Sequence, residues 1–477
     1  MLKGRDGWRQ RFHLMPPEGW LNDPNGLCQF QGIYHVFFQY SPNEPGPDGR
    51  MARTWGHYAG EDLLHLKFCG VPFWPVDPVD RDGCYSGSAL VQGEEVMLYY
   101  TGNVKQPGDH DYTYSGREAN EILVKTDGKT FGFKQTVLVN SDYPKDCTCH
   151  VRDPKVWQEG NSLYMVLGAR VAGPDRNAQT DYGEALFYRS EDGLHWTLMK
   201  TLTTPERFGY MWECPDYFEI DGHKVLGICP QGLEAEEFRY QNIYQSGYWL
   251  VDGELEGEQV LHDFTEWDYG FDFYAPQTFV DESGRRLLIG WVGMPDEPYK
   301  NPTASLAARS WENCLTVARE LTWENGRIYQ NPVPELKELR YDETHIFPDQ
   351  EMILPDGAGD FEISFLEGDE EEKWEVVIGD GLTLTYDEEI FRMELTEAVG
   401  CGRTIRRLQV PDIQFMRILV DCSVAEIYLN DGEIVLTTRF YPAYDGERQD
   451  LRVSFRCGNA AITGWKMNCL ETNKELI

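Results

Sequence analysis

The chain has 477 residues, enough for two or three domains with a large core, and its 41% hydrophobic and 13% aromatic content is typical of a globular protein. Its 80 acidic residues against 43 basic ones give a net charge of −37. This charge argues against binding to DNA, RNA or an anionic membrane, because those partners need a basic surface. We therefore expect neither a nucleic-acid nor a membrane partner.

The N-terminal segment MLKGRDGWRQRFHL is polar from its third residue and lacks the apolar stretch of a signal peptide. No run approaches the roughly 20 apolar residues that a membrane-spanning helix needs. Among the twelve cysteines, Cys229, Cys422 and Cys457 lie in apolar runs, as reduced buried thiols do. Cys147 and Cys149 are too close together for the usual zinc-ligand spacing. We expect a reduced, cytoplasmic protein without a structural metal.

Five apolar runs rich in β-branched and aromatic residues recur along the first two-thirds of the chain, each shortly after a glycine. They begin at Tyr34, Val96, Leu163, Lys224 and Arg286, so their spacing is 61 to 67 residues. A unit of about 60 residues that consists only of strands and recurs five times predicts a five-bladed β-propeller over residues 1–330. The alternative is another all-β fold in which the spacing arises by chance.

A second all-β region is expected after the repeats. Residues 331–340 (NPVPELKELR) read as a linker bounded by prolines that could hold a short helix. Residues 341–477 again alternate in hydrophobicity, and Asn430-Asp431-Gly432 between two apolar runs is a strong hairpin signal. We predict a C-terminal β-sandwich. It offers no evident catalytic group, so we expect it to stabilise the propeller or to form a homo-oligomer.

An unusual cluster of residues lies 10 or 11 positions before each repeated run. The clusters contain Asp23 in WLNDPNG, Ser86 in YSGSA, Asp153 in RDP, Glu213 in WECP and Ala275 in DFYAPQ. Equivalent positions of a propeller form a ring around its axis. If the clusters lie on the innermost strands, they face one central funnel.

The predicted ring holds three carboxylates, Asp23, Asp153 and Glu213, together with Arg152. Two carboxylates suffice to cleave a glycosidic bond, one as the acid and one as nucleophile or base. Crowding three of them should raise the pKa of at least one. Aromatic rings beside carboxylates also suit a sugar, which presents both CH faces and hydroxyl groups. The aromatic residues of the clusters are Trp20, Tyr85, Trp212, Phe273 and Tyr274.

In order along the chain, WLNDPNG, WGH (residues 55–57), SGSA, RDP, ECP and RELTW (residues 319–323) resemble glycoside hydrolase family 32. This family includes invertases, inulinases, levanases and sucrose-6-phosphate hydrolases. The resemblance covers nearly the whole chain and implies a five-bladed propeller followed by a β-sandwich. It also implies a retaining β-fructofuranosidase that needs no cofactor and acts on a small sugar.

The resemblance implies Asp23 as nucleophile, Glu213 as acid/base and Asp153 as the carboxylate that holds fructose hydroxyls. It further implies substrate contacts by Asn22, Gln39, Trp55, Ser86, Arg152 and Trp291. From their place in the clusters we add Trp20, Tyr85 and Tyr274 to the substrate-binding residues. A role in the core is the alternative for Trp55, Trp291, Tyr274 and the neighbouring Asp272.

Other functions remain open at this point. An arabinan- or xylan-acting enzyme that inverts configuration would also use three carboxylates. A fructosyltransferase or an exo-acting fructanase would use the same site, and a fructan-binding protein without activity belongs to another class. The substrate could be sucrose, sucrose 6-phosphate or a short fructo-oligosaccharide. A phosphate would call for nearby cations, for which Arg50 and Arg53 are candidates.

Overall fold

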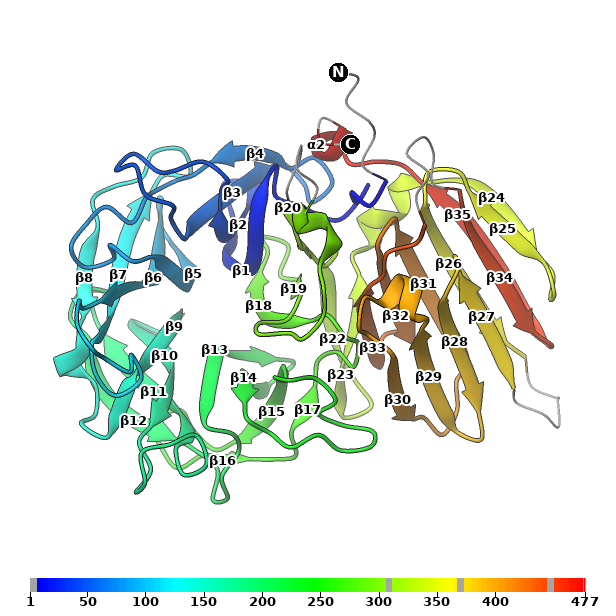
Figure 1. Cartoon of the computed structure of the whole chain (residues 1–477). Helices are drawn as coiled ribbons and strands as arrows, with labels where there is room; N and C mark the ends of the chain where they lie inside the picture. The colour runs from blue at the N-terminus through cyan, green and yellow to red at the C-terminus, as the bar shows by residue number, and fades with distance from the viewer. Residues whose placement is uncertain (1–6, 306–310, 367–372, 444–449, 475, 477) are drawn as a thin grey trace.

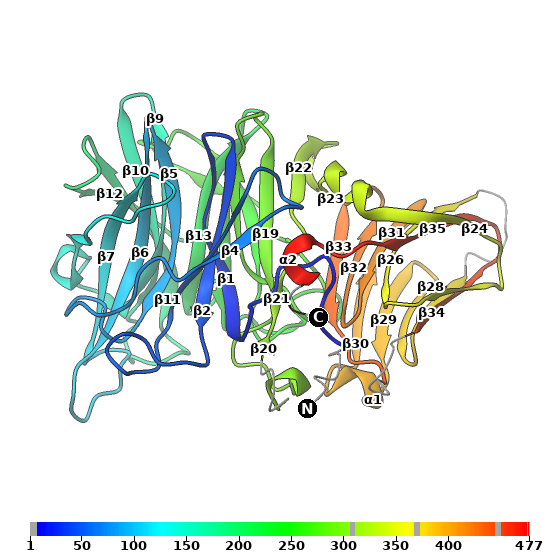
Figure 2. The ribbon, with the colours of Figure 1, turned by 90° about the horizontal axis from the view of Figure 1, so that it is seen from above.

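The computed structural model describes residues 7–305, 311–366, 373–443, 450–474 and 476. Within these ranges, five β-sheets surround a common axis, and two further sheets form a sandwich beside the fifth one (Figure 1). Figure 2, seen from above, shows the sandwich next to the propeller, with the short helix α2 (Glu471–Lys474) at their junction. The prediction of an all-β protein with a five-bladed propeller followed by a β-sandwich is confirmed.

The first two propeller sheets contain the strands up to residue 138, plus one short strand from later in the chain. The first sheet consists of β1 (Gly19–Phe30), β2 (Ile33–Ser41), β3 (Thr54–Gly60), β4 (Lys67–Gly70) and β20 (Trp311–Glu312). The second consists of β5 (Cys84–Gln92), β6 (Glu95–Lys105), β7 (Arg117–Thr126) and β8 (Gln135–Leu138). The 3-10 helix η1 (Asn140–Asp142) follows.

The other three propeller sheets follow the same plan. The third consists of β9 (Cys147–Glu159), β10 (Ser162–Val171), β11 (Tyr182–Ser190) and β12 (Thr197–Leu202). The fourth consists of β13 (Met211–Ile220), β14 (His223–Gln231), β15 (Gly247–Asp252), β16 (Val260–Leu261) and β17 (Thr265–Glu266). The fifth consists of β18 (Tyr274–Val280), β19 (Arg286–Val292), β21 (Cys314–Leu315), β22 (Arg319–Glu324) and β23 (Arg327–Pro332). The 3-10 helix η2 (Pro302–Ser305) lies between β19 and β20.

The five apolar runs of the sequence are the second strands of these sheets, namely β2, β6, β10, β14 and β19. Such strands are covered on both faces by the neighbouring sheets, so nearly every residue is apolar rather than every second one. In β6, for example, all residues between Glu95 and Lys105 are buried. The continuous apolar text therefore reflects burial on two sides.

Each innermost strand carries a one-residue bulge at the same level. The pairing with the second strand shifts between Leu21 and Pro24, Cys84 and Gly87, Arg152 and Lys155, Glu213 and Asp216, and Tyr274 and Gln277. Three bulged residues, Asp153, Cys214 and Ala275, have positive φ angles, and a proline follows each of them. A bulge leaves backbone groups unpaired, so it tolerates proline, and it redirects side chains toward the axis.

The bulges also refine the predicted ring. The clusters do lie at one level, but the three carboxylates occupy different places within it. Glu213 precedes its bulge, Asp153 is the first bulged residue and Asp23 the second. The same kind of bulge thus brings three carboxylates to one axis, although each carboxylate stands at a different position relative to its bulge.

The C-terminal sandwich packs two antiparallel sheets over a separate apolar core. One sheet consists of β24 (Arg340–Ile346), β35 (Ala460–Met467), β26 (Ala358–Phe365), β31 (Phe415–Asp421), β32 (Val424–Leu429) and β33 (Ile434–Arg439). The other consists of β25 (Glu351–Leu354), β34 (Leu451–Cys457), β27 (Trp374–Ile378), β28 (Leu382–Asp387), β29 (Ile390–Leu395) and β30 (Ile405–Gln409). The helix α1 (Glu397–Gly400) lies between β29 and β30.

The 3-10 helix η3 (Pro334–Leu339) lies in the segment expected to be a linker. The division into domains at residues 330 and 340 stays a prediction. In the part of the chain that the structure describes, no helix is long and apolar enough to cross a membrane.

The segment before β1 is fastened to the sandwich by buried charges. The backbone N–H groups of Arg11, Phe12 and His13 donate to the carboxylate of Asp421 at 2.6, 2.8 and 3.0 Å. The His13 ring contacts Asp421 through Nδ1 at 2.7 Å and Glu426 through Nε2 at 2.9 Å. Burial alone would lower the pKa of His13, but these two carboxylates outweigh it and raise the pKa to about 9. His13 is therefore cationic at neutral pH and ties the start of β1 to the sandwich.

We predict that His13 makes the protein less stable as the pH rises from about 6.5 to about 9. Its pKa is higher in the folded state, so its contribution is complete below 6.5 and is lost as the pH passes 9. The loss in the free energy of unfolding should be on the order of 2–3 kcal/mol. Urea unfolding of wild type and His13→Gln across this range tests it. His345→Gln, at an exposed histidine, is the control. Equal pH slopes for wild type and His13→Gln would contradict the prediction.

Candidate active site

A cavity of about 370 Å³ opens where the innermost strands meet. Its walls include every residue that the sequence predicts for the site except Trp55. Four further wall residues are Arg53, Arg117, Pro295 and Asp296, and Cys214 lies in the floor beside the carboxylates. The lining residues are Trp20, Asn22, Asp23, Gln39, Arg53, Tyr85, Ser86, Arg117, Arg152, Asp153, Glu213, Cys214, Tyr274, Trp291, Pro295 and Asp296.

Asp23 is held on both carboxylate oxygens. Asn22 Nδ2 donates to Oδ1 at 3.0 Å, and Ser86 Oγ donates to Oδ2 at 2.5 Å. Trp20 Nε1 in turn donates to Asn22 Oδ1 at 2.9 Å, which fixes the orientation of the amide. Burial raises the pKa of Asp23, and the charge of Glu213 acts in the same direction, whereas the two hydrogen bonds oppose it. The carboxylate is thus oriented and poorly solvated.

Glu213 is held by three side chains from three different strands. Arg152 donates to Oε1 through Nη2 at 2.6 Å and through Nε at 3.2 Å. Gln231 Nε2 and the Tyr274 hydroxyl each donate to Oε2 at 2.7 Å. The carboxyl group therefore has little freedom to rotate. Gln231 was not predicted from the sequence; its signal is a polar residue at the end of an otherwise apolar second strand.

Asp153 sits at the bulge of β9 with a φ of 65°. Its Oδ2 accepts the backbone N–H of Cys214 at 3.0 Å, and its own N–H donates to Thr101 Oγ1 at 2.9 Å. Burial raises the pKa of Asp153 to about 7, against the charge of Arg152 and together with that of Glu213. The expectation of at least one raised pKa holds for Asp23 and Asp153. Its main cause is burial, and the crowding of carboxylates is the smaller contribution.

Aromatic rings line the mouth of the cavity. Trp20 is 37% exposed at the rim and contacts Trp291 edge-on, with ring centroids 6.0 Å apart. Tyr274 packs against Trp291 in a similar way at 6.4 Å. Rings in this position can pack against the CH face of a sugar while the carboxylates contact its hydroxyls. Tyr274 and Trp291 face the cavity, so the alternative of a pure core role does not describe them.

Three aromatic residues of the motifs and clusters lie in the core. Trp55 is fully buried on β3, the third strand of its sheet. Its Nε1 donates to the backbone oxygen of Tyr85 at 2.9 Å, so it supports a wall residue. Trp55 does not line the cavity, and its expected substrate contact stays a prediction. Trp212 and Phe273 each come directly before a cavity residue in the sequence, and both point into the cores between sheets.

Cations gather on one side of the cavity. Arg53 and Arg117 join Arg152 in its wall, and within the described residues no carboxylate forms an ion pair with Arg53 or Arg117. The Arg117 Nε is buried without a hydrogen-bond partner. Arg117 and Arg152 both donate to His150 Nδ1, at 3.3 and 2.7 Å. Burial and these charges lower the pKa of His150 to about 2, so the ring is a neutral acceptor between two cations.

Arg50, the other cation considered from the sequence, lies outside the cavity. Its Nε donates to Asp48 Oδ2 at 2.7 Å on the exposed surface. Pro295 and Asp296 reach the wall from the loop after β19, and the Tyr244 hydroxyl donates to Asp296 Oδ2 at 3.0 Å. Nothing in the repeat pattern marks this loop, because it lies beyond the last repeated strand. In the residues that the structure describes, no cluster of three or more His, Cys, Asp or Glu side chains could hold a metal ion.

The cavity is large enough for a sugar and holds three carboxylates, two of which are oriented by several hydrogen bonds. This arrangement is typical of a glycoside hydrolase. The sequence agrees with this assignment over both parts of the chain. Residues 13–332 match the profile described as "Glycosyl hydrolases family 32 N-terminal domain", and residues 384–467 match "Glycosyl hydrolases family 32 C terminal". The chain belongs to glycosyl hydrolases family 32 and is a glycoside hydrolase.

Similar proteins span most of the chain. A sucrose-6-phosphate hydrolase of Bacillus subtilis is 37% identical over 92% of this chain and 90% of its own length. A raffinose invertase of Escherichia coli is 35% identical over 97% and 95%. The solved sucrose-6-phosphate hydrolase from Lactobacillus gasseri has a TM-score of 0.84 at 27% identity, covering 98% of this chain and 94% of its own. A Bombyx mori β-fructofuranosidase has 0.81 at 28%, covering 98% and 95%.

We predict that Asp153→Asn stabilises the protein at high pH while it lowers activity. The pKa of Asp153 is raised by folding, so its contribution to stability is complete below 3.8 and is lost as the pH passes about 7. The amide stays neutral, so the variant should gain on the order of 1–3 kcal/mol in free energy of unfolding near pH 8. The gain should vanish near pH 4. Denaturant unfolding at both pH values measures it, with the exposed Asp175→Asn as control. A variant no more stable at high pH would refute the prediction.

Proposed function

We propose that the enzyme is a retaining β-fructofuranosidase that hydrolyses terminal fructosyl bonds of sucrose-type sugars. The observation that carries the proposal is the set of Asp23, Asp153 and Glu213 in one cavity, each held in place by fixed donors. Two similar proteins, named as a raffinose invertase and a β-fructofuranosidase, support a fructoside as the substrate.

The proposed reaction uses two carboxyl groups. Glu213 gives its proton to the oxygen that leaves C2 of fructose, and the bond between C2 and that oxygen breaks. Asp23, aligned by Asn22 and Ser86, attacks C2 and forms a fructosyl-enzyme ester. Water then attacks C2 while Glu213 takes up its proton, and the ester bond to Asp23 breaks. The two displacements together retain the configuration at C2.

The remaining groups orient the sugar and the acid. Asp153 in its ionised form accepts hydrogen bonds from fructose hydroxyls, and the backbone N–H of Cys214 holds it in place. Arg152, Gln231 and Tyr274 keep Glu213 aimed at the leaving oxygen.

We propose that the natural substrate carries a phosphate, as in sucrose 6-phosphate. Arg53 and Arg117 supply two positive charges in the cavity wall without an ion-pair partner among the described residues, although the chain as a whole is strongly acidic. A phosphate would give both guanidinium groups charge-assisted hydrogen bonds. Several relatives named sucrose-6-phosphate hydrolase support this substrate.

Phosphorylated sugars occur inside cells, and we propose a cytoplasmic location. The twelve cysteines are all free thiols, as expected in a reducing compartment. Self-association through the sandwich stays a prediction.

We expect Asp23→Ala and Glu213→Gln to lower fructose release from sucrose by at least roughly 10²–10⁴-fold, because one loses the nucleophile and the other the acid. Glu219→Gln, on the exposed outer end of the same strand as Glu213, should retain activity. In the presence of methanol, NMR should identify methyl β-fructofuranoside as the transfer product. Full activity of Asp23→Ala would refute the nucleophile, and an α-linked product would refute retention.

Arg117→Met should lower the ratio of kcat/KM for sucrose 6-phosphate to that for sucrose by roughly 10-fold, since it removes a charged hydrogen bond to phosphate. Steady-state assays of both sugars, and of Arg53→Met, measure the ratio. Arg50→Met is the control, because Arg50 pairs with Asp48 outside the cavity. An unchanged ratio in both cavity variants would show that these arginines do not select a phosphate.

A further inference from the structure

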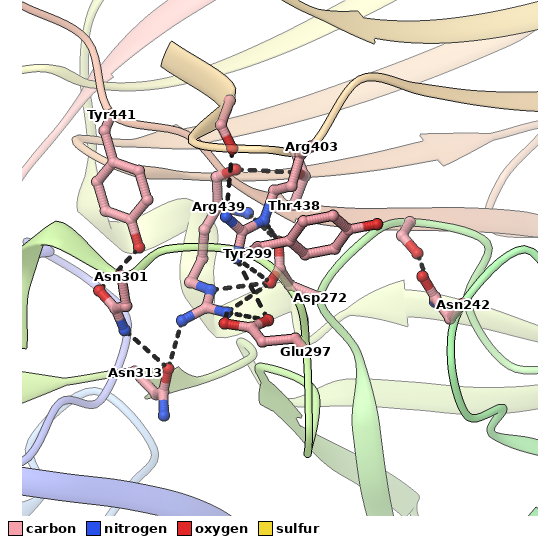
Figure 3. A network of polar contacts seen from close by, with 12 residues as sticks. Asn242, Asp272, Glu297, Tyr299, Asn301, Asn313, Arg403, Thr438, Arg439 and Tyr441 are labelled. Carbon is pink, nitrogen blue, oxygen red and sulfur yellow. Dashed lines mark hydrogen bonds and ion pairs between the residues drawn. The ribbon is translucent and has the colours of Figure 1, made fainter. Parts of the chain in front are cut away.

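Two arginines of the sandwich converge on one buried carboxylate of the propeller (Figure 3). Asp272, just before β18, is fully buried and accepts from Arg403 Nε at 2.8 Å and Nη2 at 2.9 Å. It also accepts from Arg439 through the backbone N–H at 2.8 Å and Nε at 2.9 Å. Both oxygens of Asp272 are thus held twice. Asp272 therefore lies in the contact between propeller and sandwich and not in the cavity. Of the two roles that the sequence left open for it, pocket or core, the core role applies.

Arg439, the last residue of β33, extends to two more propeller segments. Its Nη2 donates to both carboxylate oxygens of Glu297 at 2.7 Å, and its Nη1 donates to Asn313 Oδ1 at 2.5 Å. One side chain of the sandwich therefore binds three separate segments of the propeller, with only 4% of its surface exposed. Figure 3 shows Asp272, Glu297 and Asn313 gathered around its guanidinium group.

Two of these three segments, those of Asn313 and Asp272, connect directly to the active site. Asn313 Nδ2 donates to the backbone oxygen of Leu21 at 3.0 Å, and Asn22 and Asp23 follow immediately. β20, just before Asn313, also pairs with the start of β1. Asp272 lies two residues before Tyr274, whose hydroxyl donates to Glu213.

The third segment is the loop after β19. Glu297 directly follows Asp296, which lines the cavity. Each segment that Arg439 holds therefore leads within two residues to a side chain of the cavity or, through Leu21, to the nucleophile strand.

A contribution to stability alone does not explain why buried charges are used in this contact. Buried ion pairs often contribute no more than apolar residues of similar size, because desolvation offsets the attraction. A guanidinium group, however, is planar and rigid, so it fixes the mutual positions of the groups that it binds. A displacement of about 1 Å at a reacting group can lower a rate roughly 100-fold. The rigid geometry of Arg439 thus matters for the alignment of the reacting groups in the cavity.

We propose that Arg439 is a positioning residue for catalysis, through which the sandwich sets the positions of the nucleophile Asp23 and the acid/base Glu213. The inference rests on the proposed function, because it assigns a role within that reaction. It gives the sandwich a part in the chemistry although none of the described sandwich residues lines the cavity.

The test compares Arg439→Met with Arg417→Met. Arg417 is also a buried sandwich arginine, and it pairs with Asp360 through Nε at 3.0 Å and Nη2 at 2.8 Å, away from the cavity wall. Both variants lose a buried ion pair. We expect kcat per folded molecule to fall roughly 10- to 100-fold in Arg439→Met, with a shifted pH profile of kcat/KM, and to stay near wild type in Arg417→Met. Folded protein is quantified by near-UV circular dichroism.

Asn313→Gly is the second variant, since Arg439→Met could fail to fold. Glycine accepts the positive φ of this position, 69°, while the pairs of Arg439 with Asp272 and Glu297 remain. We expect a fall in kcat with little loss of stability. A merely structural role would lower the amount of folded enzyme and leave its pH profile unchanged.

The outcomes separate the inference from the proposed function. A wild-type protein that releases no fructose would overturn both. An active wild type, with Arg439→Met folded and equal to it in kcat and pH profile, would overturn the inference alone, as would an equal loss in Arg417→Met. If Arg439→Met does not fold, Asn313→Gly decides by the same criterion.

Discussion

The one-residue bulge of the five innermost strands is the constraint on which the active site depends. A regular strand would turn every second side chain into the cores between sheets, as Trp212 does. The bulge breaks this alternation at one level of the ring, so that neighbouring residues such as Glu213 and Cys214 both reach the cavity. Positive φ angles at Asp153, Cys214 and Ala275 are the local cost of that arrangement.

The site that results is chemically useful and unfavourable for folding. Burial raises the pKa of Asp23 and Asp153, which means that the folded protein destabilises their ionised forms. Arg152 and the fixed hydrogen-bond donors compensate only part of this negative charge. The large apolar cores between the sheets must provide the free energy that keeps these groups together.

The sequence was sufficient for the fold and for most of the cavity, because both leave a periodic or local signal. The repeated second strands are apolar throughout, and the clusters before them mark the bulges at Asp23, Asp153 and Glu213. Arg117 on the third strand of its sheet and Asp296 in a loop leave no such signal, so they were missed. Gln231 was missed although it is a polar residue at the end of a repeated second strand. A motif identifies a residue near a site without telling whether its ring faces the cavity, and Trp55 lies behind the wall, bonded to the backbone of Tyr85.

The first strand of the propeller shows why a second domain without catalytic groups is attached. β1 carries Asp23, the proposed nucleophile, and it is the first strand of the described residues. Its start is paired with β20, which comes from far along the chain, and the preceding segment is bound to Asp421 of the sandwich. Arg439 holds the residue after β20 from the same domain. The sandwich thus contacts both the segment before β1 and the residue after β20, so the strand that carries Asp23 is held in part by contacts that the propeller alone does not contain.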